Sequence, residues 1–223
     1  MIINSFKFEG TIGDSFIVLC KVWKLTKKGS VIIYHYTQYE YFRPLVKEIL
    51  TINKNIRIIQ LDSKEAFVDL PLQELNGFFE ASDMLDIEPH PLIGFECDLS
   101  KFVLPSRYNV VCLRSGRPDQ NHRIIPFDFL DQDINDNTIF IGTNCKHHNS
   151  KGTNLIDKTT LFEAMCILAG ATRFTGFQGF FSFLSMSMKI LTSIYVHTDS
   201  DIHAINVRIL PEWSHYINKV YQI

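Results

Sequence analysis

The spacing of apolar and polar residues alternates along the chain between strand-like and helix-like patterns. Short runs rich in β-branched and aromatic residues are typical of buried strands, and the segments between them carry apolar residues at helical spacing. The pattern in residues 1–62 therefore predicts three strands separated by two helices. The expected ranges are 2–8, 14–28, 31–36, 39–50 and 56–61, with Gly29 ending the first helix. This order predicts a parallel sheet with right-handed crossovers.

The second half of the chain shows the same alternation with less regular spacing. Its predicted strands cover 108–113, 138–141, 155–156, 174–175 and 191–196. Its predicted helices cover 160–170, 180–189 and 211–221, the last started by Pro211. Residues 119–137 leave little room for a normal crossover helix and are expected to be short or irregular.

The region between the two halves is rich in proline. Residues 65–79 predict one or two short helices, and Pro89, Pro91 and Pro105 interrupt the chain between these helices and the second half. We place a domain boundary near residue 105, which predicts domains 1–105 and 106–223.

The composition is that of an ordinary soluble globular protein. The 223 residues are 46% hydrophobic and 21% charged, with a formal net charge of −2. This balance gives no electrostatic footprint for nucleic acid, which is excluded as the main partner. The apolar stretch 174–196 contains glycine, glutamine, serine and lysine, so no transmembrane segment is predicted, while peripheral membrane contact stays open. The N-terminus shows no secretory signal pattern.

The five cysteines are odd in number and widely spaced. Cys20, Cys112 and Cys166 lie in apolar runs, where a reduced cysteine behaves as a small hydrophobe. This usage predicts a reducing, cytoplasmic compartment. Cys145, His147 and His148 have no recognised zinc-ligand spacing, so a polar surface loop is favoured and no metal or cofactor is expected.

Two strand–glycine–helix segments carry the candidate chemistry, one at 6–14 and one at 173–185. A helix entered through glycines directs backbone N–H groups and a positive dipole end at one point, which suits a phosphate. Gly176, Gln178 and Gly179 would supply such N–H groups, although a purely structural turn explains them equally well. Two such turns suggest two nucleotide-binding-like halves that face a shared cleft.

Basic residues follow the predicted strands of the second half. Arg114, Ser115 and Arg117 come after its first strand, and Lys146 comes after the next. Open α/β sheets bind ligands beyond the carboxyl ends of their strands, so these residues are candidates to neutralise a diphosphate. The alternative is a solvated basic loop.

Two threonines precede the helix predicted at 160–170. Thr159 or Thr160 could contact a bound donor, but Thr160 and Glu163 also form a capping box, and a plain helix cap is the simpler interpretation.

The motif order resembles a known family. The segment Phe8-Glu-Gly-Thr-Ile-Gly-Asp14 resembles the N-terminal glycine-glycine-aspartate turn of the ADP-heptose:lipopolysaccharide heptosyltransferases. Segments 154–163, 169–176 and 179–185 are similar in order and spacing to that family's C-terminal donor-binding region. Gln178 and Phe183 stand where the family usually has an acidic or small polar residue and a histidine, and this chain is shorter.

The resemblance implies a fold and a reaction. It implies the GT-B architecture, with an acceptor-side and a nucleotide-sugar-side Rossmann-like domain and a terminal helix, here 211–221, that crosses back. It also implies that Asp14, in a turn with Gly10 and Gly13, is the base that deprotonates the acceptor hydroxyl. The alternative for Asp14 is an N-cap carboxylate, and both roles can coexist.

The sequence therefore predicts a metal-independent inverting glycosyltransferase. It would move a hexosyl or heptosyl group from a nucleotide sugar to a hydroxyl of a glycan or other acceptor. Two alternatives stay open: a non-catalytic nucleotide- or glycan-binding module on the same fold, and a flavodoxin-like interaction protein. An NAD-dependent dehydrogenase is disfavoured, because residues 10–14 lack the G-x-G-x-x-G spacing.

Overall fold

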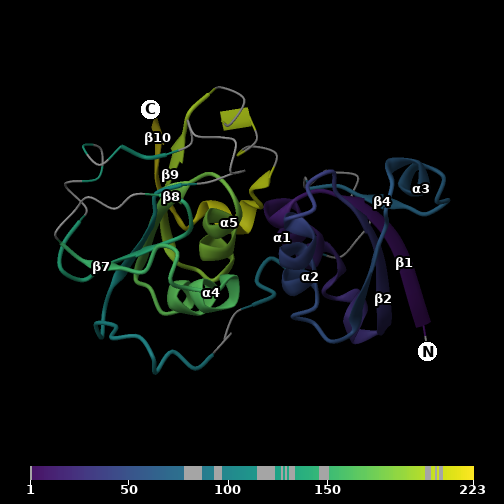
Figure 1. Cartoon of the computed structure of the whole chain (residues 1–223), viewed down its shortest axis with the longest axis horizontal. Coiled ribbons are helices and arrows are strands. Elements are labelled where there is room, and N and C mark those ends of the chain that lie inside the picture. Colours follow the sequence, from purple (N-terminus) through teal and green to yellow (C-terminus); the bar gives the residue numbers. More distant parts are fainter. Residues whose placement is uncertain are drawn as a thin grey trace. The chain divides into compact units, whose positions relative to one another are not determined.

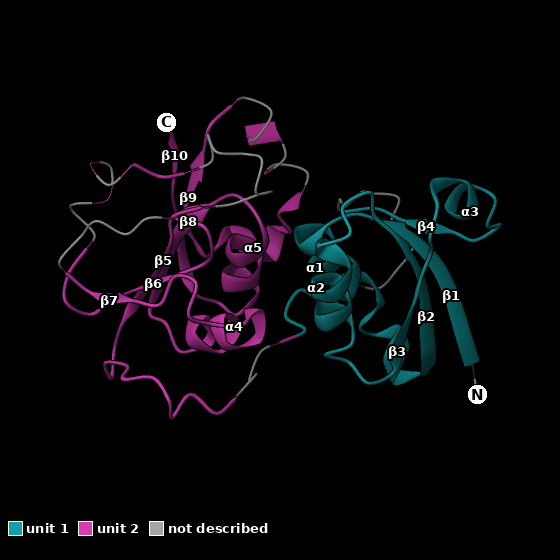
Figure 2. Ribbon diagram, viewed as in Figure 1, with its two compact units in different colours: residues 1–91 teal, residues 92–223 magenta. Residues whose placement is uncertain are grey.

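The chain folds into two compact α/β units, residues 1–91 and 92–223, in a computed structural model (Figure 2). The structure describes the whole chain except residues 1, 78–86, 93–96, 115–123, 127, 129, 131–133, 146–150, 199–201, 204, 206 and 207. The division falls after residue 91, whereas the sequence predicts it after residue 105. The segment after Pro91 is bonded to the second unit through Cys97, which explains the earlier division.

In the described part of unit 1, four parallel strands form a sheet in the order β3-β2-β1-β4. The strands are β1 (Ile2–Glu9), β2 (Gly29–Tyr36), β3 (Ile56–Gln60) and β4 (Glu74–Leu75). The helices are α1 (Ile12–Val22), the 3₁₀ turn η1 (Leu25–Lys27), α2 (Phe42–Leu50) and α3 (Lys64–Val68). Helices α1 and α2 pack together on one face of this sheet (Figure 1).

The five elements predicted for residues 1–62 are confirmed, with one difference at Gly29. Helix α1 ends at Val22, and Gly29 begins β2 instead of ending the helix. A Cβ atom on Gly29 would overlap the carbonyl of Ile2, so this position needs glycine for close strand approach. Strand β4, only two residues long, was not predicted; it pairs with β1 beside Lys7.

In the described part of unit 2, six parallel strands lie in the order β10-β9-β8-β5-β6-β7. They are β5 (Asn109–Cys112), β6 (Thr138–Ile141), β7 (Thr153–Asn154), β8 (Arg173–Phe177), β9 (Leu191–Val196) and β10 (Ile217–Gln222). The helices are α4 (Leu161–Ala169), α5 (Phe180–Ser187) and the single turn α7 (Pro211–Ser214). The elements predicted around β5, β6, α4, β8, α5 and β9 are confirmed, whereas β7 lies just before the predicted strand at 155–156.

The predicted terminal helix at 211–221 is wrong. Pro211 does start a helix, but this helix ends at Ser214, and residues 217–222 form strand β10. Strand β10 pairs in parallel with β9, and Tyr221 stacks on the buried Tyr195 with ring centroids 4.6 Å apart. A segment that contains β-branched and aromatic residues, here Ile217, Val220 and Tyr221, gains more from this sheet surface than from a helix. The irregular segment predicted at 119–137 lies largely outside the described residues.

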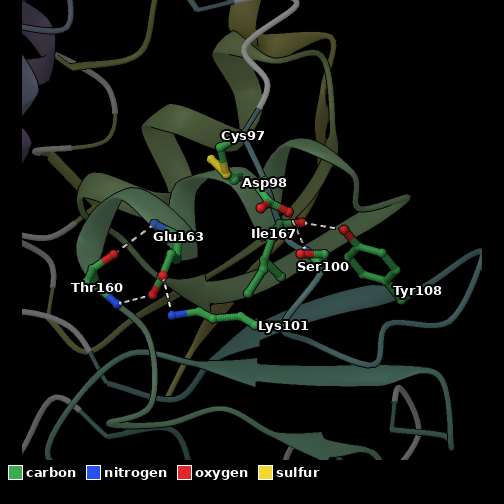
Figure 3. The surroundings of a disulfide bond; sticks show 9 residues. Cys97, Asp98, Ser100, Lys101, Tyr108, Thr160, Glu163 and Ile167 are labelled. Carbon is green, nitrogen blue, oxygen red and sulfur yellow. Dashed lines mark hydrogen bonds and ion pairs between the residues drawn. A yellow bond between two sulfur atoms is a disulfide. The ribbon is translucent and has the colours of Figure 1, made fainter.

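A disulfide ties the start of unit 2 to helix α4. Cys97 bonds Cys166 of α4, and the side chains nearby add two further links (Figure 3). Lys101 forms an ion pair with Glu163, and the hydroxyl of Tyr108 donates to the carbonyl of Ile167 at 2.8 Å. The prediction that Cys166 is a reduced core residue is therefore wrong.

The other three cysteines form no disulfide. Cys20 and Cys112 are buried, as predicted, and Cys145 is half-buried. The expectation of a reducing compartment rested on reduced cysteines throughout, and the disulfide removes part of that support. Among the described helices, none has both the length and the apolar character needed to cross a membrane.

We expect the disulfide to stabilise unit 2. It joins residues 69 positions apart, and closing a loop of that size typically raises the free energy of unfolding by about 2–4 kcal/mol. Urea unfolding of the wild type with and without dithiothreitol measures this difference.

The matched control is Cys97→Ser, whose stability should not respond to dithiothreitol. Thiol titration of the denatured, unreduced wild type should find three free thiols of the five cysteines. Five free thiols in this titration would contradict the disulfide.

Candidate functional site

Each sheet has one point where its strand order reverses. In unit 1 this point lies between β1 and β4, and in unit 2 it lies between β5 and β8. All the described strands are parallel, so their carboxyl ends share one edge, and the crevice at the reversal is where open α/β sheets bind ligands. The predicted site residues follow these strands.

Asp14 lies in the first turn of α1, directly after β1. Thr11 is the N-cap residue, and its backbone N–H and its hydroxyl each donate to Oδ2 of Asp14 at 2.9 Å. Asp14 is therefore the N3 residue of a capping box, and not the N-cap carboxylate that the sequence offered as its alternative role. Gly13 is the second residue of α1 and not part of the turn before it, because the helix begins at Ile12.

Two glycines from adjacent strand ends enclose Asp14. Gly10 follows β1, and a Cβ atom added there would lie 2.8 Å from Cβ of Asp14. Gly77 follows β4, and its added Cβ would overlap Oδ1 and lie 2.8 Å from Cβ of the same residue. The half-buried Asp14 side chain therefore sits at the reversal point of unit 1, against backbone from both strands. Gly77 was missed, although Asn76-Gly77 is a recognisable turn signal.

His35 lies beneath this turn and was also missed. It is fully buried at the end of β2, with Nε2 3.2 Å from the Gly10 carbonyl oxygen and Nδ1 2.9 Å from the side-chain amide of Gln60. Burial lowers the pKa of His35, outweighing the opposing effect of these two hydrogen bonds. A single histidine inside a strand pattern gives no signal of such a role.

In unit 2, Arg114 lies just beyond the carboxyl end of β5. Its Nη1 donates to the carbonyl of Asn144 at 2.8 Å. Asn144 follows β6 in a left-handed conformation (φ 55°), and its N–H donates to Oδ1 of Asp157 at 2.9 Å. Asp157 follows β7, so three neighbouring strand ends are linked along one edge. Cys145 lies beside Arg114; burial raises the pKa of its thiol and the Arg114 charge opposes that rise.

The glycine segment of unit 2 differs from the predicted phosphate cradle. Gly176 is an interior residue of β8, where a Cβ would lie 3.2 Å from the Cys112 carbonyl oxygen. The N–H of Gln178 donates to the Tyr195 carbonyl at 2.9 Å, and that of Gly179 donates to Oγ of Ser182 at 3.0 Å. These two N–H groups are therefore bonded within the protein.

Helix α5 nevertheless starts at the reversal point of unit 2. Gly179 is its N-cap residue, with φ 158° and ψ −160°, a combination nearly confined to glycine. The first helical hydrogen bond runs from the Phe183 N–H to the Gly179 carbonyl. The positive end of the α5 dipole thus lies beside the β5 end that carries Arg114, since β5 and β8 are paired.

Of the two threonines before α4, Thr160 has the role of helix cap. Thr160 caps α4: its hydroxyl accepts from the Glu163 N–H at 3.2 Å, and its own N–H donates to Oε2 of Glu163 at 2.9 Å. Thr159 is half-buried immediately before this cap. The hydrogen bond from Lys101 is the main cause that lowers the pKa of Glu163.

Three predicted donor-site residues, Ser115, Arg117 and Lys146, lie outside the described residues, as do His147 and His148. Across the residues that are described, no three His, Cys, Asp or Glu side chains are grouped to hold a metal ion.

Two α/β units with parallel sheets, each with one strand reversal, match the GT-B-like class of fold. No protein-family model matches the sequence, and neither does any curated protein.

Solved structures of glycosyltransferases share this fold. The E. coli ADP-heptose LPS heptosyltransferase II aligns over 99% of this chain and 90% of its own, with 10% identity and a TM-score of 0.56. A glycosyl transferase family 9 protein from Veillonella parvula aligns over 86% and 80%, with 9% identity and a TM-score of 0.54.

A third similar structure is the dodecameric iron-containing heptosyltransferase TibC in complex with ADP-D-β-D-heptose. It aligns over 99% of this chain, with 13% identity and a TM-score of 0.52. This chain spans only 61% of that protein. The chain thus has the heptosyltransferase-like fold.

We expect Gly77→Ala to destabilise unit 1, because its methyl group would overlap the Asp14 side chain. Overpacking of this kind typically costs about 1–3 kcal/mol, measured by urea unfolding. In an Asp14→Ala background the same change should cost less, since the carboxylate is gone. Equal costs in both backgrounds would show that Gly77 does not press on Asp14.

Proposed function

We propose that this chain is an inverting glycosyltransferase that needs no metal and moves a sugar from a nucleotide-sugar donor to an acceptor hydroxyl. One observation carries the proposal: the Asp14 carboxylate lies at the strand reversal of unit 1, enclosed by Gly10 and Gly77, in a chain with a glycosyltransferase fold. The proposal includes a cytoplasmic location and a glycan or similar acceptor.

Asp14 is the base in this proposal. An inverting transfer needs one carboxylate to take the hydroxyl proton as the oxygen attacks the anomeric carbon. Both bonds from Thr11 reach Oδ2, and they hold the carboxylate in a defined orientation at the helix start. A base held by its own helix cap needs little reorganisation before it reacts.

Unit 2 supplies the donor site. The leaving nucleoside diphosphate carries negative charge, which a guanidinium and a helix N-terminus both stabilise. Arg114 and the start of α5 lie at the ends of the paired strands β5 and β8. TibC, which shares the fold, was solved with ADP-D-β-D-heptose, so ADP-heptose is the first donor to test.

A non-catalytic nucleotide-binding module is the second candidate. It is favoured by Phe183, which stands where the resembling family has a histidine. Phe183 is fully buried and packs on Trp213 with ring centroids 6.3 Å apart, so it offers no polar group to a donor.

We expect Asp14→Asn to separate the role of Asp14 as base from its role in the helix cap. The amide oxygen of asparagine still accepts from the Thr11 N–H, so the free energy of unfolding should stay close to that of the wild type. The transfer rate from ADP-heptose should fall about 100-fold or more, because an amide is not a base. Asp14→Ala should lose both the transfer activity and the helix cap, and the lost cap should lower the free energy of unfolding by about 1 kcal/mol. Full transfer activity in Asp14→Asn would refute Asp14 as the base.

We expect Arg114→Ala to weaken nucleoside diphosphate binding. ADP at a hundred times its dissociation constant should stabilise the wild type by about 2.7 kcal/mol in a thermal-shift experiment, and the variant should respond much less. The matched control is Arg173→Ala, at the amino end of β8 and so at the opposite edge of the same sheet. An equal loss in both variants would point to non-specific charge, and no shift in the wild type would remove ADP as the ligand.

A further inference from the structure

A stacked pair of rings supports the turn that carries Asp14. Phe8 and His35 are register partners on β1 and β2, both fully buried, with ring centroids 5.2 Å apart and planes inclined by 28°. A Cβ on Gly10 would lie 2.7 Å from the Phe8 ring, so the Gly10 backbone rests directly on this pair. The turn therefore packs on a rigid pair of aromatic rings.

The hydrogen bonds of His35 determine its tautomer. The Gly10 carbonyl can only accept, so the proton of the Nε2 bond belongs to the imidazole. A second proton on Nδ1 would place a positive charge in a fully buried position, and this burial outweighs the two hydrogen bonds and the charge of Glu9, which favour the charged ring; the charge of Arg43 disfavours it further. His35 is therefore neutral, with hydrogen on Nε2 and a lone pair on Nδ1.

Gln60 must then donate to His35. Its side-chain amide lies 2.9 Å from Nδ1, and its Nε2 atom is buried without a partner when the amide oxygen faces the ring. A 180° rotation of the amide exchanges these two atoms and gives that nitrogen a partner in Nδ1. One assignment thus satisfies the buried nitrogen of Gln60 and the lone pair of His35.

The chain of bonds continues through a single peptide plane. The Gly10 carbonyl that accepts from His35 and the Thr11 N–H that donates to Oδ2 of Asp14 belong to the same planar unit. Fixing the carbonyl fixes the N–H, and each bond polarises the next.

We propose that His35 is a positioning residue, which orients the Gly10–Thr11 peptide, and through it the Asp14 carboxylate, by a relay that starts at Gln60. Its consequence for the reaction rests on the proposed function. The relay itself does not, and it can be measured without any substrate.

The first experiment is ¹⁵N NMR of histidine-labelled wild-type protein near neutral pH. We expect a neutral His35 ring with hydrogen on Nε2. A proton on Nδ1, or a doubly protonated ring, would overturn the relay.

The second experiment is hydrogen exchange at the Thr11 amide in three variants. His35→Phe keeps the ring stacking and removes the donor, so protection should fall by about fivefold to tenfold, the equivalent of one hydrogen bond. His35→Gln places an amide nitrogen near the position of Nε2 and should restore most of it. Ile33→Ala, a buried change on the same face of β2, is the control for general destabilisation. Equal loss in His35→Phe and Ile33→Ala would overturn the positioning role.

Kinetics then separate the relay from the proposed function. His35→Phe should lower kcat and leave KM for the nucleotide sugar unchanged, while His35→Gln recovers kcat. Wild-type protein with the expected tautomer and exchange pattern but no transfer would refute the proposed function and leave the relay standing. Unchanged kcat in His35→Phe, in an active enzyme, would refute the positioning role.

Discussion

Parallel strand pairing is the constraint on which the rest of this structure depends. Every strand in the described part of both sheets runs in the same direction as its neighbours, so the carboxyl ends of all the described strands of a unit lie at one edge. The chain order reverses once in each sheet, and at that point two loops leave in opposite directions. Asp14 in unit 1, and Arg114 with the start of α5 in unit 2, occupy these two points because of topology alone.

The sequence predicted most of this framework because its signals are local. The strands around Phe6, Val110 and Ile194 are recognisable from β-branched and aromatic runs, and the α4 cap from Thr160 and Glu163. The errors lie where contacts between residues far apart in the sequence determine the secondary structure. Strand β4 has two residues and exists only through pairing with β1, and residues 217–222 become a strand because β9 offers them a surface.

The candidate site was predictable only in part, for the same reason. Asp14 and Arg114 follow strands directly, so sequence order places them at the sheet edge. Gly77 and His35 matter through the backbone that they approach or bond, and neither has a local pattern that marks it as part of a site. The disulfide is similar: Cys97 and Cys166 are far apart in sequence, and spacing alone gave no reason to pair them.

The two units use backbone groups in different ways, and this bears on the reaction. In unit 1 the peptide between Gly10 and Thr11 is directed at a carboxylate, which orients a group able to accept a proton. In unit 2 the N–H groups of Gln178 and Gly179 are bonded to the protein itself, so the diphosphate would depend more on Arg114 and the α5 dipole. In the proposed inverting transfer, charge at the donor site and a fixed base at the acceptor site would be complementary, because the leaving group and the attacking hydroxyl need stabilisation of opposite kinds. In a module that only binds a nucleotide, the first arrangement would still be needed and the Asp14 carboxylate would serve only in the helix cap.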